Sequence, residues 1–173
     1  GLLHIHGGAW IIGSKNHQGL PLCYLLASRG WTVINANYRL SPHATFPDQL
    51  IDIKHAIRWY REHAAEYGAD PEFLVLDGLS AGAHLASLAA LTSNDPELQP
   101  GFEGVDTRVN GCVSFYGVYD VVDRDDLWPH GGMEEVLEHH VLKASVEEAP
   151  ELWALASPMD QVGADAPPFL IVH

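Results

Sequence analysis

The stretch Phe73-Leu74-Val75-Leu76-Asp77-Gly78-Leu79-Ser80-Ala81-Gly82 decides the fold of this 173-residue chain. Its first half is a short apolar run that predicts a buried strand over Phe73 to Asp77. Its second half is a G-x-S-x-G turn, followed by mostly Ala, Leu and Ser up to Thr92. Such small residues allow a helix over Ala81 to Thr92 to lie close against a sheet. A strand that passes into a helix through this turn leaves Ser80 at the carboxyl end of the strand.

Other apolar runs on both sides alternate between strand and helix patterns. Strands are expected over Leu2 to Ile5, Trp31 to Tyr38, Arg108 to Tyr116 and Pro168 to Val172, and helices over His17 to Ser28 and Asp48 to Tyr67. In the longer helix, one face is apolar and carries Leu50, Ile53, Ile57, Tyr60 and Ala64. This alternation indicates βαβ units, so the predicted class is α/β, with a parallel central sheet flanked by helices.

One segment, residues 118–150, departs from this pattern. It is rich in His and Glu and contains Trp128, Met133 and the pair His139-His140. We interpret it as an insertion between two strands. Insertions at this place lie over the carboxyl ends of the strands, where open α/β sheets bind ligands. We therefore expect a cap-like segment that forms a lid or a pocket wall.

The charge balance excludes some partners. There are 9 Lys and Arg against 23 Asp and Glu, a formal net charge of −14. A surface this negative repels phosphate backbones and anionic lipid, so nucleic acid is not an expected partner. No apolar run reaches the roughly 18 to 20 residues needed to span a bilayer. The sequence opens without Met, inside an apolar run, so we expect the native N-terminus to precede Gly1, and localisation stays open.

The sequence predicts neither a metal nor an organic cofactor. Cys23 and Cys112 have no CxxC or Cys/His ligand spacing, and we expect both to be buried free thiols. The turn around Ser80 contains no Gly-Lys-Ser/Thr and no G-x-G-x-x-G, which excludes a phosphate-binding loop there.

The physical setting of Ser80 suits a nucleophile. Gly78 and Gly82 are small enough for the backbone to bend tightly, and the bend exposes the serine hydroxyl. The following helix begins at Ala81, so its free N–H groups and positive dipole favour an oxyanion beside Ser80. The alternative is a glycine-bounded turn in which the serine only caps a helix.

A second motif follows the first expected strand. In His6-Gly7-Gly8-Ala9-Trp10, glycines leave backbone N–H groups free to converge on a negative oxygen. Acyl transfer needs such donors where charge develops in the tetrahedral intermediate. The expected donors are the N–H groups of Gly8 and Ala9, with Ala81 and also Gly7. A flexible loop after a strand is the alternative for this motif alone.

Together these motifs resemble the esterase and lipase branch of the α/β-hydrolase fold, which includes hormone-sensitive-lipase-like carboxylesterases and acetyl and feruloyl esterase-like enzymes. Three further stretches match, namely Asn37-Tyr38-Arg39-Leu40-Ser41-Pro42, Phe46-Pro47-Asp48-Gln49-Leu50 and Pro167-Pro168-Phe169-Leu170-Ile171-Val172-His173. The resemblance implies that residues 1–173 are the central portion of one such domain, strands three to seven, truncated at both ends. It implies Ser80 as nucleophile and the N–H groups of Gly7, Gly8, Ala9 and Ala81 as oxyanion-hole donors. It also implies a small-molecule ester as substrate.

The chain departs from the family pattern at two places. Ala9 replaces a third glycine, which keeps the N–H but narrows the space beside the acyl group. Ala83-His84 replaces a double glycine, and Ser80 to Leu85 also resembles kynurenine-formamidase-like enzymes. The choice between ester and amide therefore stays open. We expect His84, four residues after Ser80 on one helix, to be a packed histidine rather than the catalytic base.

The remaining members of a catalytic triad are not identified. In this fold the acid and then the histidine follow the nucleophile, the acid soon after the strand that ends at His173. We expect both beyond residue 173, and the 173 residues alone to be at best a very weak hydrolase. Asp120, Asp160 and Asp165 are candidate acids by residue type only. A formamidase or amidase, or a noncatalytic α/β-hydrolase-like interaction module, remain alternatives. The sequence does not indicate an oligomeric state.

Overall fold

Five strands form one parallel sheet in the computed structural model, which describes residues 1–128 and 132–173. Their order across the sheet is β2-β1-β3-β4-β5, and every neighbouring pair is parallel. The strands are β1 (Leu2–Ile5), β2 (Val33–Ala36), β3 (Val75–Leu79), β4 (Gly111–Phe115) and β5 (Phe169–Val172). The predicted α/β class is confirmed.

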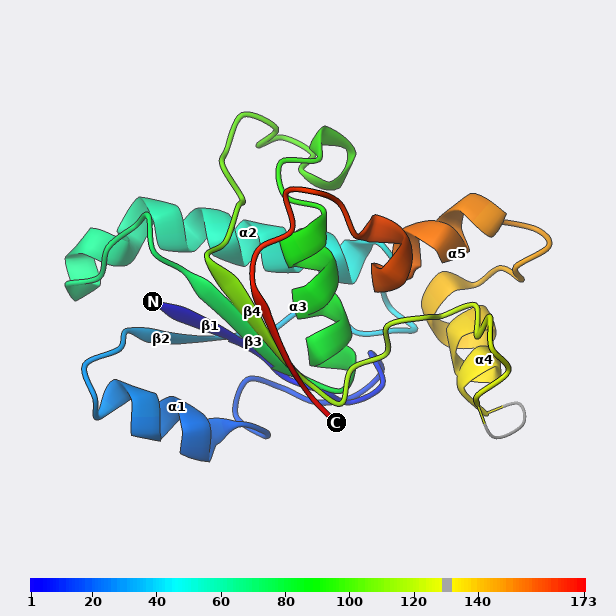
Figure 1. The fold of residues 1–173 in the computed structure, drawn as a ribbon, viewed down its shortest axis with the longest axis horizontal. Coiled ribbons are helices and arrows are strands. Elements are labelled where there is room, and N and C mark those ends of the chain that lie inside the picture. Colours follow the sequence, from blue (N-terminus) through cyan, green and yellow to red (C-terminus); the bar gives the residue numbers. More distant parts are fainter. Residues whose placement is uncertain (129–131) are drawn as a thin grey trace.

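Helices cover both faces of the sheet. They are α1 (Leu20–Ala27), α2 (Asp48–His63), α3 (Ala81–Leu91), α4 (Gly132–Val136) and α5 (Pro150–Ala156). Figure 1 shows α1 on one face of the sheet, and α2 and α3 on the other. The apolar face predicted for α2 is confirmed, because all five of its residues are buried. Within the described ranges, no helix is long and apolar enough to cross a membrane.

The element boundaries differ from the prediction by a few residues. β3 starts at Val75 and continues to Leu79, because its ladder with β4 extends through the pair Leu79 and Phe115. The helix expected up to Tyr67 ends as α2 at His63, and a 3-10 turn covers Ala64–Tyr67. The elements predicted around Ser80 are therefore present, and β3 brings the serine to the carboxyl edge of the sheet.

The segment interpreted as an insertion does lie between β4 and β5. It contains α4, a π-helix over Leu137–Leu142, and α5, which carries it past residue 150. Leu137, Val141 and Trp153 belong to the main hydrophobic core, and each is at most 2% exposed. Residues 129–131 of this segment lie outside the described residues. Its packing fixes the segment to the domain, and its role as a lid or pocket wall stays a prediction.

Two hydrogen bonds attach this segment to the loop before α2. The N–H of Phe46 donates to the carbonyl of Val141 at 2.9 Å. The ammonium group of Lys143 donates to the carbonyl of Pro42 at 2.8 Å. Both partners on the loop belong to stretches matched by the family resemblance, so the loop and the segment support each other.

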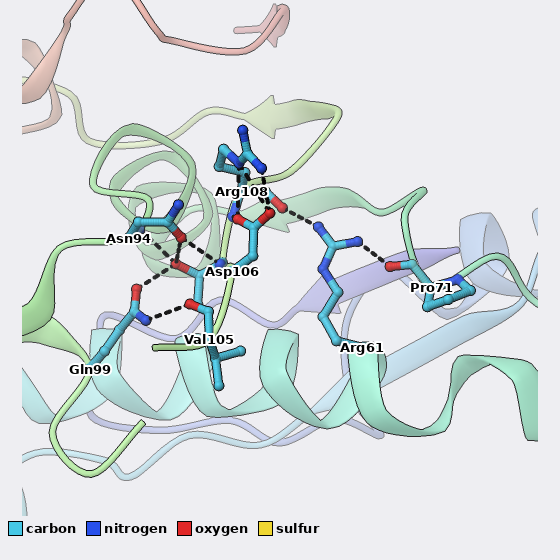
Figure 2. Close-up of polar contacts among 8 residues, drawn as sticks. Arg61, Pro71, Asn94, Gln99, Val105, Asp106 and Arg108 are labelled. Atoms are coloured by element: carbon cyan, nitrogen blue, oxygen red, sulfur yellow. Dashed lines mark hydrogen bonds and ion pairs between the residues drawn. The ribbon is translucent and has the colours of Figure 1, made fainter. Parts of the chain in front are cut away.

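Polar side chains connect the loops at the amino-terminal edge of the sheet, opposite the carboxyl edge that carries Ser80 (Figure 2). The Thr107 hydroxyl donates to Gln99 at 2.6 Å, and the Thr107 N–H donates to Asn94 at 2.7 Å. Arg61 of α2 reaches the carbonyls of Pro71 and Arg108, which precede β3 and β4. These contacts fix the loops at the amino ends of the strands, away from Ser80.

Gly82 brings the start of α3 into direct backbone contact with the end of β1. A Cβ atom on Gly82 would lie 2.1 Å from the carbonyl oxygen of Ile5 and 2.5 Å from that of His6. No side chain fits in that space, because both obstructing atoms belong to the backbone. The two motifs found in the sequence are therefore adjacent in the fold.

We predict that Gly82→Ala lowers the free energy of unfolding by about 3 kcal/mol or more. In an unobstructed helix the same change stabilises by about 1 kcal/mol, so the sign of the effect tests the contact. Urea unfolding followed by circular dichroism measures it. Gly104→Ala is the matched control, because a Cβ there meets nothing within 4 Å. A Gly82→Ala variant as stable as the parent would contradict the described contact.

Candidate active site

Ser80 has a strained backbone between β3 and α3. Its φ of 55° and ψ of −120° are unfavourable for a residue with a side chain. Its N–H donates to the carbonyl of Phe115 at 3.0 Å, and its own carbonyl accepts from the N–H of His84 at 3.0 Å. Hydrogen bonds to β4 and to α3 therefore fix Ser80 in this strained conformation.

The loop after β1 lies directly against this turn. A Cβ atom on Gly7 would be 3.3 Å from the Cβ of Ser80 and 2.6 Å from the carbonyl oxygen of Leu79. Gly8, Ala9 and Trp10 then follow with φ values of 123°, 50° and 60°. Three successive positive values turn the chain sharply, and non-glycine residues adopt them at a cost.

The backbone N–H groups around Ser80 differ in what they bind. The N–H of Gly7 donates to the side-chain oxygen of Gln18 at 3.2 Å. Within residues 1–128 and 132–173, no hydrogen bond engages the N–H groups of Gly8, Ala9 or Ala81. Of the four expected oxyanion donors, Gly7 is therefore already engaged, and the other three remain available.

His84 is a packed histidine, which confirms the expectation for it. It is 1% exposed. Its Nδ1 accepts from the indole N–H of Trp10 at 3.1 Å, and its Nε2 donates to the carbonyl of Ala156 at 2.7 Å. These partners require the neutral ring with its proton on Nε2. Burial lowers the pKa of His84 to about 4, despite the Ala156 carbonyl. Both ring nitrogens are occupied, so His84 cannot serve as the base for Ser80.

His6 and Tyr38 support the same loop from its other side. The His6 ring stacks on the Tyr38 ring with centroids 4.4 Å apart. The Tyr38 hydroxyl donates to the His6 carbonyl at 3.0 Å, and His6 Nδ1 donates to the Gly7 carbonyl at 2.8 Å. Burial lowers the pKa of His6, which keeps the ring neutral near pH 7. Tyr38 belongs to one of the stretches matched by the family resemblance, and its contacts support the loop after β1.

The candidate acids are paired with a cation or lie at the other edge of the sheet. Asp120 and Asp160 both form ion pairs with Arg124. Asp165 is exposed in the loop before β5, at the amino edge of a sheet whose carboxyl edge carries Ser80. The structure therefore brings together the proposed nucleophile and oxyanion donors, and we assign the acid role to none of these three residues.

A cleft of about 710 Å³ opens at the carboxyl edge of the sheet. Its walls include Tyr116, Leu127, Trp128, Met133, Met159 and His173, together with Asp120, Asp123 and Asp125. Tyr116 directly follows Phe115, whose carbonyl binds the N–H of Ser80. Trp128 and Met133, which belong to the segment expected to form a lid or a pocket wall, line this cleft. Trp10 of the loop after β1 is buried against His84.

Sequence reasoning missed three polar residues next to the site. His4 on β1 and Asp77 on β3 form a buried pair, and Gln18 contacts both His4 and Gly7. The only sequence signal was a His and an Asp inside two apolar runs. The two thiols follow the prediction, since Cys23 and Cys112 are free and buried. Burial raises their pKa values to about 11 and about 12.

Comparison with protein families gives a match over nearly the whole chain. The family model BD-FAE matches residues 2–173. The chain belongs to the BD-FAE family. Its five-stranded parallel sheet with flanking helices has α/β-hydrolase esterases as structural neighbours, so the fold implied by the resemblance is confirmed.

Individual proteins similar to this BD-FAE chain are named as esterases. It is 45% identical over 172 residues to esterase LipQ and 48% identical over 172 residues to the probable carboxylic ester hydrolase LipM, both of Mycobacterium tuberculosis. Each match covers 99% of this chain and 40% of the relative. Esterase 2 of Thermogutta terrifontis, solved after phosphonylation by sarin, has a TM-score of 0.80 and 30% identity. That match covers 99% of this chain and 60% of the esterase. The BD-FAE chain thus spans less than half the length of LipQ and LipM.

The environment of His84 predicts acid lability. The unfolded histidine binds a proton near pH 6.5, whereas the folded one binds it only near pH 4. The unfolded state therefore gains protons first as pH falls, and stability decreases below pH 6.5. Between pH 7 and 4.5 we expect His84 to contribute a loss of about 3 kcal/mol.

Urea unfolding at pH 7 and pH 4.5 measures this loss. His84→Asn should be less stable at pH 7 but lose less on acidification. His140→Asn, at an exposed position, is the control and should behave as the parent does. An equal pH dependence in the parent and His84→Asn would refute the assignment.

Proposed function

We propose that this chain carries the nucleophile and the oxyanion hole of a serine esterase. The observation that supports this most directly is the juxtaposition at Ser80. A strained serine at the start of α3 lies against the loop that carries Gly8 and Ala9, whose N–H groups, like that of Ala81, bind no other group in the described parts of the chain. This combination has no structural benefit of its own, because the strain and the unengaged donors both cost stability.

The proposed reaction has two steps. The Ser80 Oγ attacks the ester carbonyl, its proton passes to a base, and the carbonyl oxygen becomes an oxyanion. The N–H groups of Gly8, Ala9 and Ala81 donate to that oxyanion, and the positive end of the α3 dipole adds to its stabilisation. Collapse releases the alcohol, which takes up the proton. Water then hydrolyses the acyl-enzyme by the same path, which yields the acid and restores Ser80.

The base and the acid are proposed to come from beyond residue 173. His84 has both nitrogens occupied. Asp120 and Asp160 pair with Arg124, and Asp165 lies at the wrong edge of the sheet. We therefore assign no base or acid role within the described residues. The cleft lined by Trp128 and Met133 is the proposed site of the ester substrate.

The relatives support ester hydrolysis over amide hydrolysis and over a noncatalytic interaction module. LipQ and LipM carry esterase names at 45% and 48% identity. Esterase 2 of Thermogutta terrifontis is phosphonylated by sarin, a reagent that modifies activated nucleophiles. Transfer of that chemistry to Ser80 is part of the proposal.

We predict that Ser80→Ala in the complete polypeptide lowers turnover of p-nitrophenyl acetate by at least about 10⁴-fold, because the acyl-enzyme cannot form. Ser93→Ala, near the end of the same helix, should leave turnover unchanged. The measurement is the rate of p-nitrophenol release, with circular dichroism as a check on folding.

Matched ester and anilide substrates distinguish the alternatives. Faster hydrolysis of the ester supports an esterase, and faster hydrolysis of the anilide would make the chain an amidase. Parent and Ser80→Ala proteins with equal, negligible rates on both would favour a noncatalytic module.

A further inference from the structure

A buried imidazole and carboxylate face each other across two strands beneath the proposed site. His4 of β1 and Asp77 of β3 are partners in the strand register, and they are 0% and 1% exposed. The Nδ1 of His4 lies 3.1 and 3.0 Å from the two carboxylate oxygens of Asp77. Its Nε2 lies 2.8 Å from the carbonyl oxygen of Gln18. Both ring nitrogens therefore have an oxygen partner.

These contacts fix the protons on the ring. A carbonyl oxygen only accepts, so His4 Nε2 must carry a proton. With Asp77 as a carboxylate, which only accepts, Nδ1 also donates, and the ring is then an imidazolium. Burial lowers the pKa of His4, but the hydrogen bond and charge of Asp77 and the Gln18 carbonyl raise it by more, so it lies above its usual value.

The contacts continue from His4 to the loop beside Ser80. Gly19 packs so closely on the His4 ring that a Cβ would lie 2.1 Å from Cε1. The backbone at residues 18 and 19 is therefore fixed by the His4 ring, through a hydrogen bond to the Gln18 carbonyl and close packing against Gly19. From this position, the Gln18 side-chain oxygen accepts the N–H of Gly7, at 3.2 Å. Gly7 in turn lies against Ser80.

We propose that Asp77, His4 and Gln18 are positioning residues, which set the distance between Ser80 and the loop that carries the Gly8 and Ala9 donors. The inference rests on the proposed function of that loop. None of the three touches the reacting atoms. They act in sequence, because Asp77 orients His4, His4 holds the Gln18 backbone, and the Gln18 side chain holds Gly7.

This arrangement predicts a particular dependence on pH. When His4 loses a proton, the remaining one stays on Nδ1 beside the Asp77 carboxylate, and Nε2 then repels the Gln18 carbonyl. Asp77 on β3 and His6, directly after β1, interact with the charge on His4, while His17 in the following loop acts on His6 and Asp77 acts on Cys23 of α1. Burial and the charge of Asp77 raise the pKa of Cys23 to about 11, so this thiol stays neutral up to pH 9. Because the folded-state pKa of His4 is raised, its contribution is complete below pH 6.5 and is lost as pH rises through that pKa.

The first test compares single variants of the complete polypeptide on p-nitrophenyl acetate. Gln18→Ala should lower kcat about tenfold with KM within twofold, because a small misplacement of the loop weakens transition-state contacts most. Gln18→Glu keeps an acceptor oxygen and should restore most of kcat. Asn16→Ala, in the same loop, is the control and should match the parent. The ratio of parent to Gln18→Ala kcat should fall toward one at high pH, where the triad histidine titrates equally in both proteins.

The outcomes separate this proposal from the proposed function. If Ser80→Ala abolishes turnover while Gln18→Ala keeps the parent kcat, the positioning role is wrong and the esterase stands. If Ser80→Ala retains turnover, the proposed function fails regardless of Gln18. A loss of kcat in Gln18→Ala that Gln18→Glu does not restore would also overturn the positioning role.

A second measurement needs no activity. ¹⁵N spectra of the histidine rings in the Ser80→Ala protein should show both nitrogens of His4 protonated at pH 7. Asp77→Asn should lower the pH at which His4 titrates. A single protonated nitrogen on His4 at pH 6 would overturn the proposal, even if Asp77→Asn fails to fold.

Discussion

The contact between the start of α3 and the end of β1 is the constraint on which the candidate site depends. Gly82 lets two backbones approach to a distance that no side chain permits. This approach lays the helix N-terminus beside the loop that begins at Gly7. Ser80 then lies next to N–H groups from both that have no partner among residues 1–128 and 132–173. Hydrophobic burial of α3 supplies the force, while the absence of a Cβ determines how closely the parts meet.

The segment between β4 and β5 is linked to the candidate site through the core, in addition to lining the cleft. The Ala156 carbonyl binds His84, which binds Trp10 in the loop after β1. A chain of contacts therefore runs from α5 through α3 to the loop. A disturbance in this segment would reach Ser80 through packed, hydrogen-bonded groups, so its effect on the site need not involve direct contact with a substrate.

Local patterns were enough to predict the fold and the two motifs. The apolar runs gave the strands, the spacing from Leu50 to Ala64 gave the buried face of α2, and the residues flanking Ser80 gave the elbow. The pairing of His4 with Asp77 depends on the register between β1 and β3, which no short stretch contains. The burial of Lys54 is a second feature that local sequence patterns do not predict. It is buried in α2 with its ammonium group on the Thr92 carbonyl, and burial lowers its pKa to about 8. The helices from Gly132 to Ala156 were missed because their apolar residues interrupt a charged, irregular stretch.

The backbone conformation of Ser80 also bears on how this lineage can change. A left-handed residue with a side chain costs roughly 1 to 2 kcal/mol, and glycine removes most of that cost. Replacement of Ser80 by glycine would therefore raise stability but would remove the proposed nucleophile. Homologues no longer under selection for the proposed hydrolysis should therefore replace this serine early. Replacement by glycine should raise their free energy of unfolding.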